Sequence, residues 1–262
     1  MKIAVLVDLT PLCISAVKMG SAIAEISNAD LVLIHISDFG SDEQKVNEEM
    51  EKLLSTVPSG VSVVQHVEKG AFFSLIPTVI SDIGADLALV PTHGKVGLMQ
   101  NLFGANILKL VKTIPIPTLV IQDGSIIPEN GFSNILFPVG PHDDFHIKYE
   151  QTGRFAKMFG TKVIIYTVRN DVRGISEKMR INISESKNHF EKQGISFDEV
   201  SEEPSVFSVG YARHILQYPK SSDTDVICIM ANVSDDNGYI GKSDKENMLL
   251  NEHRVPVLCA NL

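Results

Sequence analysis

Short apolar runs alternate with longer amphipathic or charged segments along the whole chain. In the first half, the runs that we predict as strands are Ile3–Asp8, Ala29–Ile36, Val61–Glu68, Asp86–Pro91 and Ile116–Ile121. Most of them are apolar at nearly every position, which is typical of parallel strands that are buried on both faces. The pattern therefore predicts an α/β fold, in which helices cover both faces of a mostly parallel sheet.

The segments between these strands have the composition of helices. The predicted helices are Thr10–Asn28, Ser41–Val57, Phe72–Ile83 and Leu98–Thr113. Thr10 and Pro11 are a favourable pair for the N-cap and first turn of the first helix. A threonine hydroxyl can accept from a free helix N–H group, and proline lacks only a donor that the first turn does not use.

The same succession of elements occurs a second time. The corresponding strands are Ile135–Gly140, Gly160–Val168, Ile195–Glu202, Asp225–Met230 and Val255–Ala260, and two of the helices are Asp171–Gln193 and Val206–Tyr218. The first two strand pairs are offset by 132 residues and the last two by 139, so a single insertion of 7 residues in the second copy explains the change. We infer a duplicated domain.

The repeat predicts two tandem doubly wound domains, each with a five-stranded mostly parallel sheet. Their expected bounds are residues 1–124 and 133–262, joined by a polar linker at Gln122–Ser133. The last strand of each copy is strongly apolar and has no further strand beside it in its own domain, which leaves an exposed sheet edge. We expect these two strands to pair in an internal pseudo-dimer, and a homodimer or protein partners are further possibilities.

Composition limits the classes of function. A net charge of -9 argues against nucleic acid as a partner, since no basic patch is present to neutralise phosphates. No apolar run reaches the roughly 18 residues of a membrane span, so no membrane association is expected. The three cysteines are odd in number and dispersed in apolar surroundings (Cys13, Cys228 and Cys259). They predict buried free thiols in a protein of the reducing cytoplasm.

The candidate binding residues lie where strands of the first copy end. In an open α/β sheet, ligands bind beyond the carboxyl ends of the strands, where the winding reverses. Asp8, Ile36 and the loop after Val90 occupy such positions. That loop contains His93 and Gly94, and nine residues later Gly104, Ala105 and Asn106 lead into a helix. Glycines and a helix N-terminus together favour a bound phosphate.

These motifs resemble the universal stress protein family, and in particular its tandem-domain members. The resemblance rests on the strand ending at Asp8, on LVLIHI at Leu31–Ile36, on THG at Thr92–Gly94 and on the IPTLVI strand ending at Ile121. It implies an adenine nucleotide alpha hydrolase-like fold and a site for ATP or AMP, with no metal ion. In that site Asp8 and Ile36 would contact the base side, and Gly94 and Gly104 would hold the phosphates.

The sequence also departs from the family pattern. Pro91 stands where the first loop glycine belongs, and Ala105 stands where a hydroxyl residue would bond phosphate. If each change removes one charge-assisted hydrogen bond, each costs about 1.5–3 kcal/mol. The combined loss in affinity is on the order of a hundredfold or more. In the second copy the matching positions are Gly140, Met230, Val233, Ser243 and Asp244, so we expect a degenerate domain that binds no ATP.

Several residues have both a functional and a structural interpretation. Asp8 could hold a base or bond the backbone at its turn, and His93 and Lys95 could line the site or lie in a plain loop. His35 is expected to pack in its strand. His142 and His146 have the spacing of metal ligands, but Asp143 and Asp144 beside them are more simply a helix cap and first-turn acids.

Three functions follow from these interpretations. The first is a regulatory or binding module that is not an enzyme and retains one weak nucleotide site in the first domain. The alternative is a stress-response scaffold in which both sites have lapsed. The third is an enzyme that cleaves or transfers an adenylyl group, for which only His93 and Lys95 are at hand.

Overall fold

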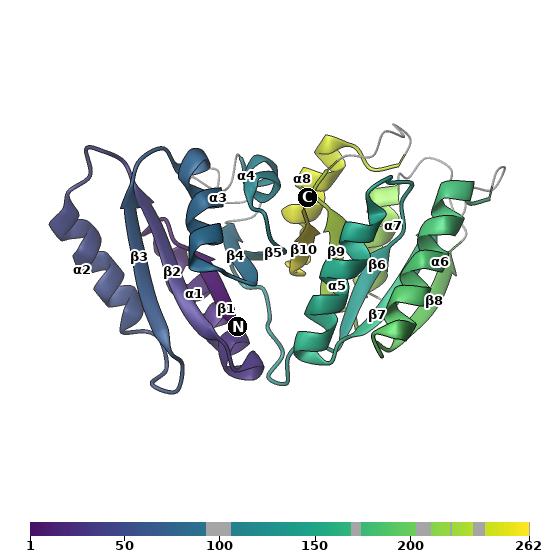
Figure 1. Cartoon of the computed structure of the whole chain (residues 1–262), viewed down its shortest axis with the longest axis horizontal. Helices are drawn as coiled ribbons and strands as arrows, with labels where there is room; N and C mark the ends of the chain where they lie inside the picture. Colours follow the sequence, from purple (N-terminus) through teal and green to yellow (C-terminus); the bar gives the residue numbers. More distant parts are fainter. Residues whose placement is uncertain (93–105, 169–173, 203–210, 221, 233–238, 262) are drawn as a thin grey trace.

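A computed structural model of the chain describes residues 1–92, 106–168, 174–202, 211–220, 222–232 and 239–261 (Figure 1). Its strands form one ten-stranded sheet in the order β3-β2-β1-β4-β5-β10-β9-β6-β7-β8. The strands of the first half are β1 (Lys2–Leu6), β2 (Asp30–Ser37), β3 (Val63–Lys69), β4 (Leu87–Thr92) and β5 (Thr118–Gln122). Those of the second half are β6 (Asn134–Pro138), β7 (Lys162–Val168), β8 (Phe197–Glu202), β9 (Val226–Met230) and β10 (Val257–Ala260). The predicted α/β class is confirmed.

Helices cover both faces of this sheet. One face carries α1 (Leu12–Ser27), α2 (Glu43–Leu54), α5 (Phe145–Phe159) and α6 (Glu177–Lys192), and the other carries α3 (Phe72–Ile83), α4 (Ile107–Thr113), α7 (Tyr211–Gln217) and α8 (Lys242–Leu249). Alternate residues of each central strand enter the two cores: Val5 packs towards α1, whereas Leu6 packs towards α3 and α4. None of the described helices is long and apolar enough to cross a membrane.

The two halves meet at their last strands. Within each half every neighbouring pair is parallel, but β5 and β10 pair antiparallel, with Leu119 opposite Leu258. Asn261 strengthens this junction, because its Nδ2 donates to Ile116 O at 3.0 Å and to Thr118 Oγ1 at 3.3 Å. The edge of each half-sheet is thereby covered by the other half.

The strand registers locate the insertion in the second copy. Leu31 pairs with Val63 in the first half and Val163 pairs with Phe197 in the second, so the offset is 132 at the second strand but already 134 at the third. By β4 and β9 it is 139. The prediction of one insertion of seven residues is therefore wrong: two extra residues precede β8 and five follow it.

Two predicted helix starts also differ from the structure. Pro11, and not Thr10, is at the N-cap of α1, and its backbone is already helical at φ -55. Thr10 instead turns its hydroxyl back to Asp8. The helix predicted from Asp171 begins at Glu177, where the Ser176 hydroxyl accepts from Met179 N at 3.2 Å. The first part of the helices predicted from Leu98 and Val206 lies outside the described residues.

The cysteines lie as predicted. Cys13, Cys228 and Cys259 are buried free thiols. Burial raises the pKa of Cys13 to about 12, with a further contribution from the negative charge of Asp8. Burial also raises the pKa of Cys228 and of Cys259. All three side chains are protonated near neutral pH, and a thiolate nucleophile has no support among them.

Candidate functional site

The winding of the first half reverses between β1 and β4. The chain leaves β1 through α1 on one face and enters β4 from α3 on the other face, while the two strands lie side by side, with Val5 opposite Leu89. Asp8 follows the carboxyl end of β1, and Thr92 ends β4. The two polar residues therefore lie at the position where open α/β sheets bind ligands.

Asp8 organises the turn between β1 and α1. Its Oδ1 accepts from Thr10 N at 3.1 Å, from Thr10 Oγ1 at 2.6 Å and from Cys13 Sγ at 3.1 Å. Asp8 N in turn donates to Cys13 Sγ at 3.2 Å. Leu9, between them, has a left-handed φ of 59°, which is uncommon for a residue other than glycine. The backbone interpretation of Asp8 is thus correct for Oδ1, while Oδ2 accepts no hydrogen bond from the described residues.

His35 supports the same turn from the neighbouring strand. It is buried, as expected, and its Nδ1 lies 2.9 Å from Val7 O. Because a carbonyl oxygen can only accept, Nδ1 carries the proton in this contact. His35 therefore fixes the carbonyl that immediately precedes Asp8. Packing alone was expected of this histidine, and only the parallel pairing of β1 and β2 reveals its positioning role.

Thr92 is a polar residue that the sequence interpretation left unassigned. Its side chain is 1% exposed, and in the described part of the chain its Oγ1 has no hydrogen-bond partner. An unsatisfied buried hydroxyl is unfavourable and occurs most often where a water molecule or a ligand completes the site. A threonine that closes an otherwise apolar strand was the available sequence signal.

The remaining predicted residues divide into three groups. Ile36 and Val90 are buried in the same core, on the face covered by α3 and α4. Asn106 is the exposed N-cap residue of α4 and makes no side-chain cap. The others lie outside the described residues, so the structure does not place His93, Gly94, Gly104 or Ala105.

Pro91 belongs to β4 itself. It pairs in register with Ile121 of β5. On its other side the pairing of β4 with β1 reaches only to Leu89. The missing N–H group of Pro91 is tolerated here because the ladder with β1 has already ended.

The corresponding position in the second half is filled by its own side chains. Gly140 matches Asp8, and a Cβ on it would lie 2.8 Å from Cζ of Tyr239. His142 stacks on Phe145 and meets the edge of Tyr239, at ring distances of 6.5 and 6.2 Å. Burial, with nearby Lys245 and Lys148, lowers the pKa of His142 to about 3. An uncharged histidine and a tyrosine ring thus fill the space beside Gly140, at the position that matches Asp8.

Two buried lysines close the rest of this second position. Lys148 Nζ donates to Pro138 O at 2.5 Å and lies 4.6 Å from the ring centre of Phe137. Lys245, which matches Asn106, donates from Nζ to Met230 O at 2.6 Å and to Asn232 O. Burial is the main cause that lowers the pKa of Lys148 to about 8 and of Lys245 to about 7. The lysines satisfy carbonyls at the ends of β6 and β9.

The metal interpretation of the second half finds no support in the described residues, where no group of three or more His, Cys, Asp or Glu side chains could hold a metal ion. Of the two predicted acids, Asp144 is at the N-cap of α5 but makes no side-chain cap hydrogen bond. Asp143 precedes the helix and pairs with Lys178, so neither aspartate lies in the first turn.

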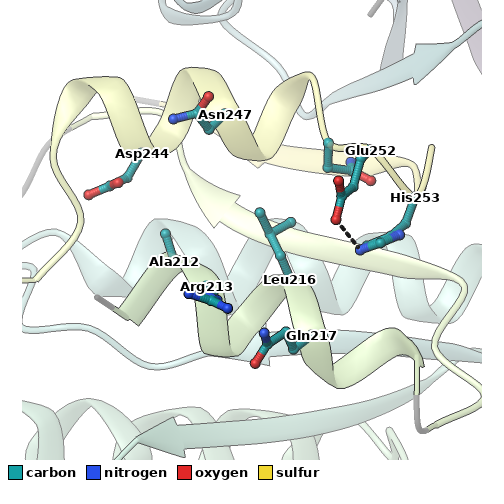
Figure 2. A pocket seen from close by; sticks show the side chains of 9 residues that line it. Ala212, Arg213, Leu216, Gln217, Asp244, Asn247, Glu252 and His253 are labelled. Atoms are coloured by element: carbon teal, nitrogen blue, oxygen red, sulfur yellow. Dashed lines mark ion pairs between the residues drawn. The ribbon is translucent and has the colours of Figure 1, made fainter. Parts of the chain in front are cut away.

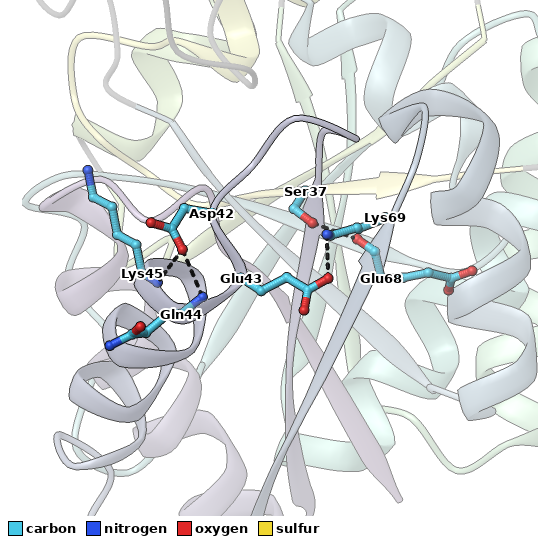
Figure 3. A network of polar contacts seen from close by, with 7 residues as sticks. All are labelled: Ser37, Asp42, Glu43, Gln44, Lys45, Glu68 and Lys69. Atoms are coloured by element: carbon cyan, nitrogen blue, oxygen red, sulfur yellow. Dashed lines mark hydrogen bonds and ion pairs between the residues drawn. The ribbon is translucent and has the colours of Figure 1, made fainter.

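Two further cavities lie among the described residues. The larger, of about 510 Å³, lies between α7 and α8 (Figure 2). The smaller, of about 230 Å³, lies at the ends of β2 and β3 beside the start of α2. Lys69 pairs with Glu43 across it at 2.5 Å, and Asp42 caps α2 by accepting from Gln44 N at 3.0 Å (Figure 3). The Lys69–Glu43 pair and the Asp42 cap hold the start of α2 against the end of β3, so we interpret these contacts as a structural network.

Comparison with known proteins agrees with this architecture. Residues 1–122 match the model of the Universal stress protein family. A universal stress protein from Archaeoglobus fulgidus DSM 4304 is 12% identical, with a TM-score of 0.64 over 99% of this chain and 96% of that one. A putative universal stress protein from Pseudomonas aeruginosa UCBPP-PA14 is 18% identical, with a TM-score of 0.60 over 99% and 92%.

A functionally unknown protein from Pseudomonas aeruginosa PAO1 is similar to the same extent. It is 17% identical, with a TM-score of 0.61 over 99% of this chain and 92% of that one. None of the curated proteins that were compared matches the chain. At these identities the solved structures show a shared fold over both halves, while the family match covers the first half.

Proposed function

We propose that the chain is a tandem universal stress protein that acts by binding and not by catalysis, with one adenine-nucleotide site in its first half. The family match over residues 1–122 and the shared fold over 99% of the chain support this class. ATP or AMP would lie at the carboxyl ends of β1 and β4. Ile36 and Val90 would form the apolar wall, and the segment from His93 to Asn106 would lie near the phosphates.

The unpaired hydroxyl of Thr92, beside the turn that carries Asp8, is the observation that favours this site. Asp8 Oδ2 is an acceptor for a donor group of the base or ribose, and Thr92 Oγ1 offers a donor and an acceptor. The second half lacks both groups, since Gly140 and Ala231 stand at the matching positions. The nucleotide site is therefore proposed for the first half alone.

Calorimetric titration of the whole chain with ATP and with AMP tests the proposal. We expect one site per chain with a dissociation constant weaker than micromolar, because Pro91 and Ala105 remove phosphate contacts. Asp8→Asn keeps an oxygen for Thr10 but replaces the free acceptor by a donor, and Thr92→Val removes the hydroxyl at constant shape. Each variant should weaken binding roughly tenfold.

Asp82→Asn is the matched control, because Asp82 is exposed on α3, near the opposite end of the strands. It should bind nucleotide like the unchanged chain. The absence of binding heat at millimolar ATP and AMP would instead favour the scaffold, in which both sites have lapsed. Two binding events per chain would contradict the assignment of the site to the first half.

A further inference from the structure

The groove between α7 and α8 has the size of a small-molecule site. Its volume of about 510 Å³ falls within the range usual for such sites. Ala212 and Leu216 of α7 contribute its apolar part, and Asn247 of α8 and His253 of the following turn lie on the other side (Figure 2).

The first half provides an internal comparison for this groove. At the offset of 139 residues, Ala212 matches Phe73 and Asn247 matches Leu108. In the first half the ring of Phe73 lies 4.3 Å from Lys109 Nζ, and Leu108 is 3% exposed, so large apolar side chains fill the space between α3 and α4. In the second half a small residue and an exposed amide replace them, and the groove is open.

Several polar groups of the groove have no hydrogen-bond or ion-pair partner among the described residues. Arg213 and Gln217 are exposed and lie one turn apart on α7, and no hydrogen bond or ion pair joins either side chain, or that of Asn247, to the described residues. The carboxylates are engaged: Asp244 accepts from Gly241 N at 3.3 Å, and Glu252 lies 3.2 Å from His253 Nε2. The groove thus combines two side-chain amides and two acids with a guanidinium that no described residue pairs.

A rigid support lies beneath these groups. Asn251 Nδ2 donates to Met248 O at 3.0 Å and to Val255 O at 2.9 Å. The backbone carbonyl of Asn251 accepts from Gln122 Nε2 of β5 at 3.0 Å. The turn after α8 is therefore anchored to the junction of the two halves. A ligand in the groove would meet a wall that is already ordered, which lowers the entropic cost of binding.

We propose that this groove binds a small zwitterion of about dipeptide size, with its carboxylate on Arg213 and its ammonium group towards Asp244 and Glu252. A guanidinium can bind a carboxylate through two parallel hydrogen bonds. The side-chain amides of Gln217 and Asn247 can donate to and accept from a peptide group. A purely anionic ligand would meet two carboxylates, and a purely cationic one would leave Arg213 uncompensated.

Titration of the whole chain with L-alanyl-L-alanine, followed by calorimetry, tests this assignment. N-acetyl-L-alaninamide, which has the peptide groups but neither charge, is the ligand control. We expect binding of the dipeptide and at least tenfold weaker binding of the blocked compound. Equal binding of the two compounds, or no binding of the dipeptide at millimolar concentration, would overturn the proposal.

Variants test the residues. Arg213→Ala should weaken dipeptide binding roughly tenfold. Asn247→Leu, which introduces the residue found at the matching position of the first half, should weaken it to a similar extent. Ser74→Ala changes the position that matches Arg213 in the first half and should leave binding unchanged. All three positions are exposed, so unchanged thermal unfolding serves as the check on folding. Dipeptide binding that is unaffected by Arg213→Ala would contradict the site, whatever the result with ATP.

Discussion

The ring of Tyr239 lies directly on the Cα of Gly140, so closely that a Cβ there would stand 2.8 Å from both Cδ1 and Cζ. Glycine at this position is a packing requirement of the second half. Asp8, at the matching position of the first half, has no such ring above it among the described residues and uses its carboxylate to hold a turn. The two strand ends thus differ: side chains fill the one in the second half, whereas in the first half Asp8 Oδ2 and Thr92 Oγ1 have no hydrogen-bond partner in the described part of the chain.

Restoring the aspartate in the second half should destabilise the protein. We expect Gly140→Asp to lower the free energy of unfolding by about 1–3 kcal/mol, because the new side chain overlaps the Tyr239 ring. Urea unfolding measures this change. Gly60→Ala is the control, since a Cβ at Gly60 meets nothing within 4 Å. If Gly140→Asp is as stable as the unchanged chain, Tyr239 does not fill this position.

The buried lysines predict a stability that rises with pH. Their folded pKa values are about 8 for Lys148 and about 7 for Lys245, against 10.5 for an ordinary lysine. Above pH 7 the unfolded chain therefore binds more protons than the folded chain, so the free energy of unfolding increases with pH. Below about pH 7 the free-energy cost of keeping both buried lysines charged is fully present. This cost disappears as the pH approaches 10.5, the pKa of an ordinary lysine. We expect a gain of about 3 kcal/mol between about pH 6.5 and 8.5.

Urea unfolding at several pH values measures that slope. Lys245→Met should flatten it over this range, and Lys148→Met should flatten its upper part. Lys242→Met is the control, because Lys242 is exposed at the start of the same helix as Lys245. A slope that both buried-lysine variants leave unchanged would show that other groups cause it.

Two threonines in neighbouring strands should respond oppositely to the loss of their hydroxyls. Thr92 Oγ1 is buried without a partner, so Thr92→Val should raise the free energy of unfolding by about 1 kcal/mol in the absence of ligand. Thr118 Oγ1 donates to Ile116 O at 3.1 Å and accepts from Asn261 Nδ2 at 3.3 Å, so Thr118→Val should lower it by a similar amount. Thermal unfolding of the two variants side by side measures both changes. A loss of stability in Thr92→Val would indicate that the Thr92 hydroxyl has a hydrogen-bond partner in solution.

The junction of the halves depends on Asn261. Asn261→Ala removes two hydrogen bonds, to Ile116 O and to Thr118 Oγ1, and leaves Thr118 Oγ1 as the one described side-chain donor to Ile116 O, so we expect a loss of about 1–3 kcal/mol. Asn47→Ala, at an exposed position of α2, should change stability by less than about 0.5 kcal/mol. Equal unfolding midpoints for the two variants would show that these bonds do not contribute to the junction.

The fold followed from local pattern because each strand and helix has its own periodicity. Apolar runs such as Ile3–Val7 located β1 to within two residues, and the repeat identified the duplication. The start of α1 was misassigned because Thr10 can serve either as an N-cap or as a donor to Asp8, and composition cannot choose between these roles. Similarly, only strand registers could divide the insertion around β8.

The site was partly predictable for the same reason. Asp8 was proposed as a site residue from its place at a strand end, but the surroundings of Thr92 and the support from His35 depend on which strands lie side by side. Asp8 and Thr92 are 84 positions apart in sequence, and parallel pairing of β1 and β4 brings their strand ends together. No local pattern in the sequence records that distance.

The sequence by itself determined the class of fold, the duplication and the drift of the second copy, because these depend on residue type and spacing. Only the tertiary structure decided which of the changed positions in the second copy are filled and which are open. Tyr239, Lys148 and Lys245 come from different elements and close one strand end, while small Ala212 opens a groove between two helices. Whether a position is filled or open depends on the volumes that distant segments bring to it, and those volumes are set only when the chain folds.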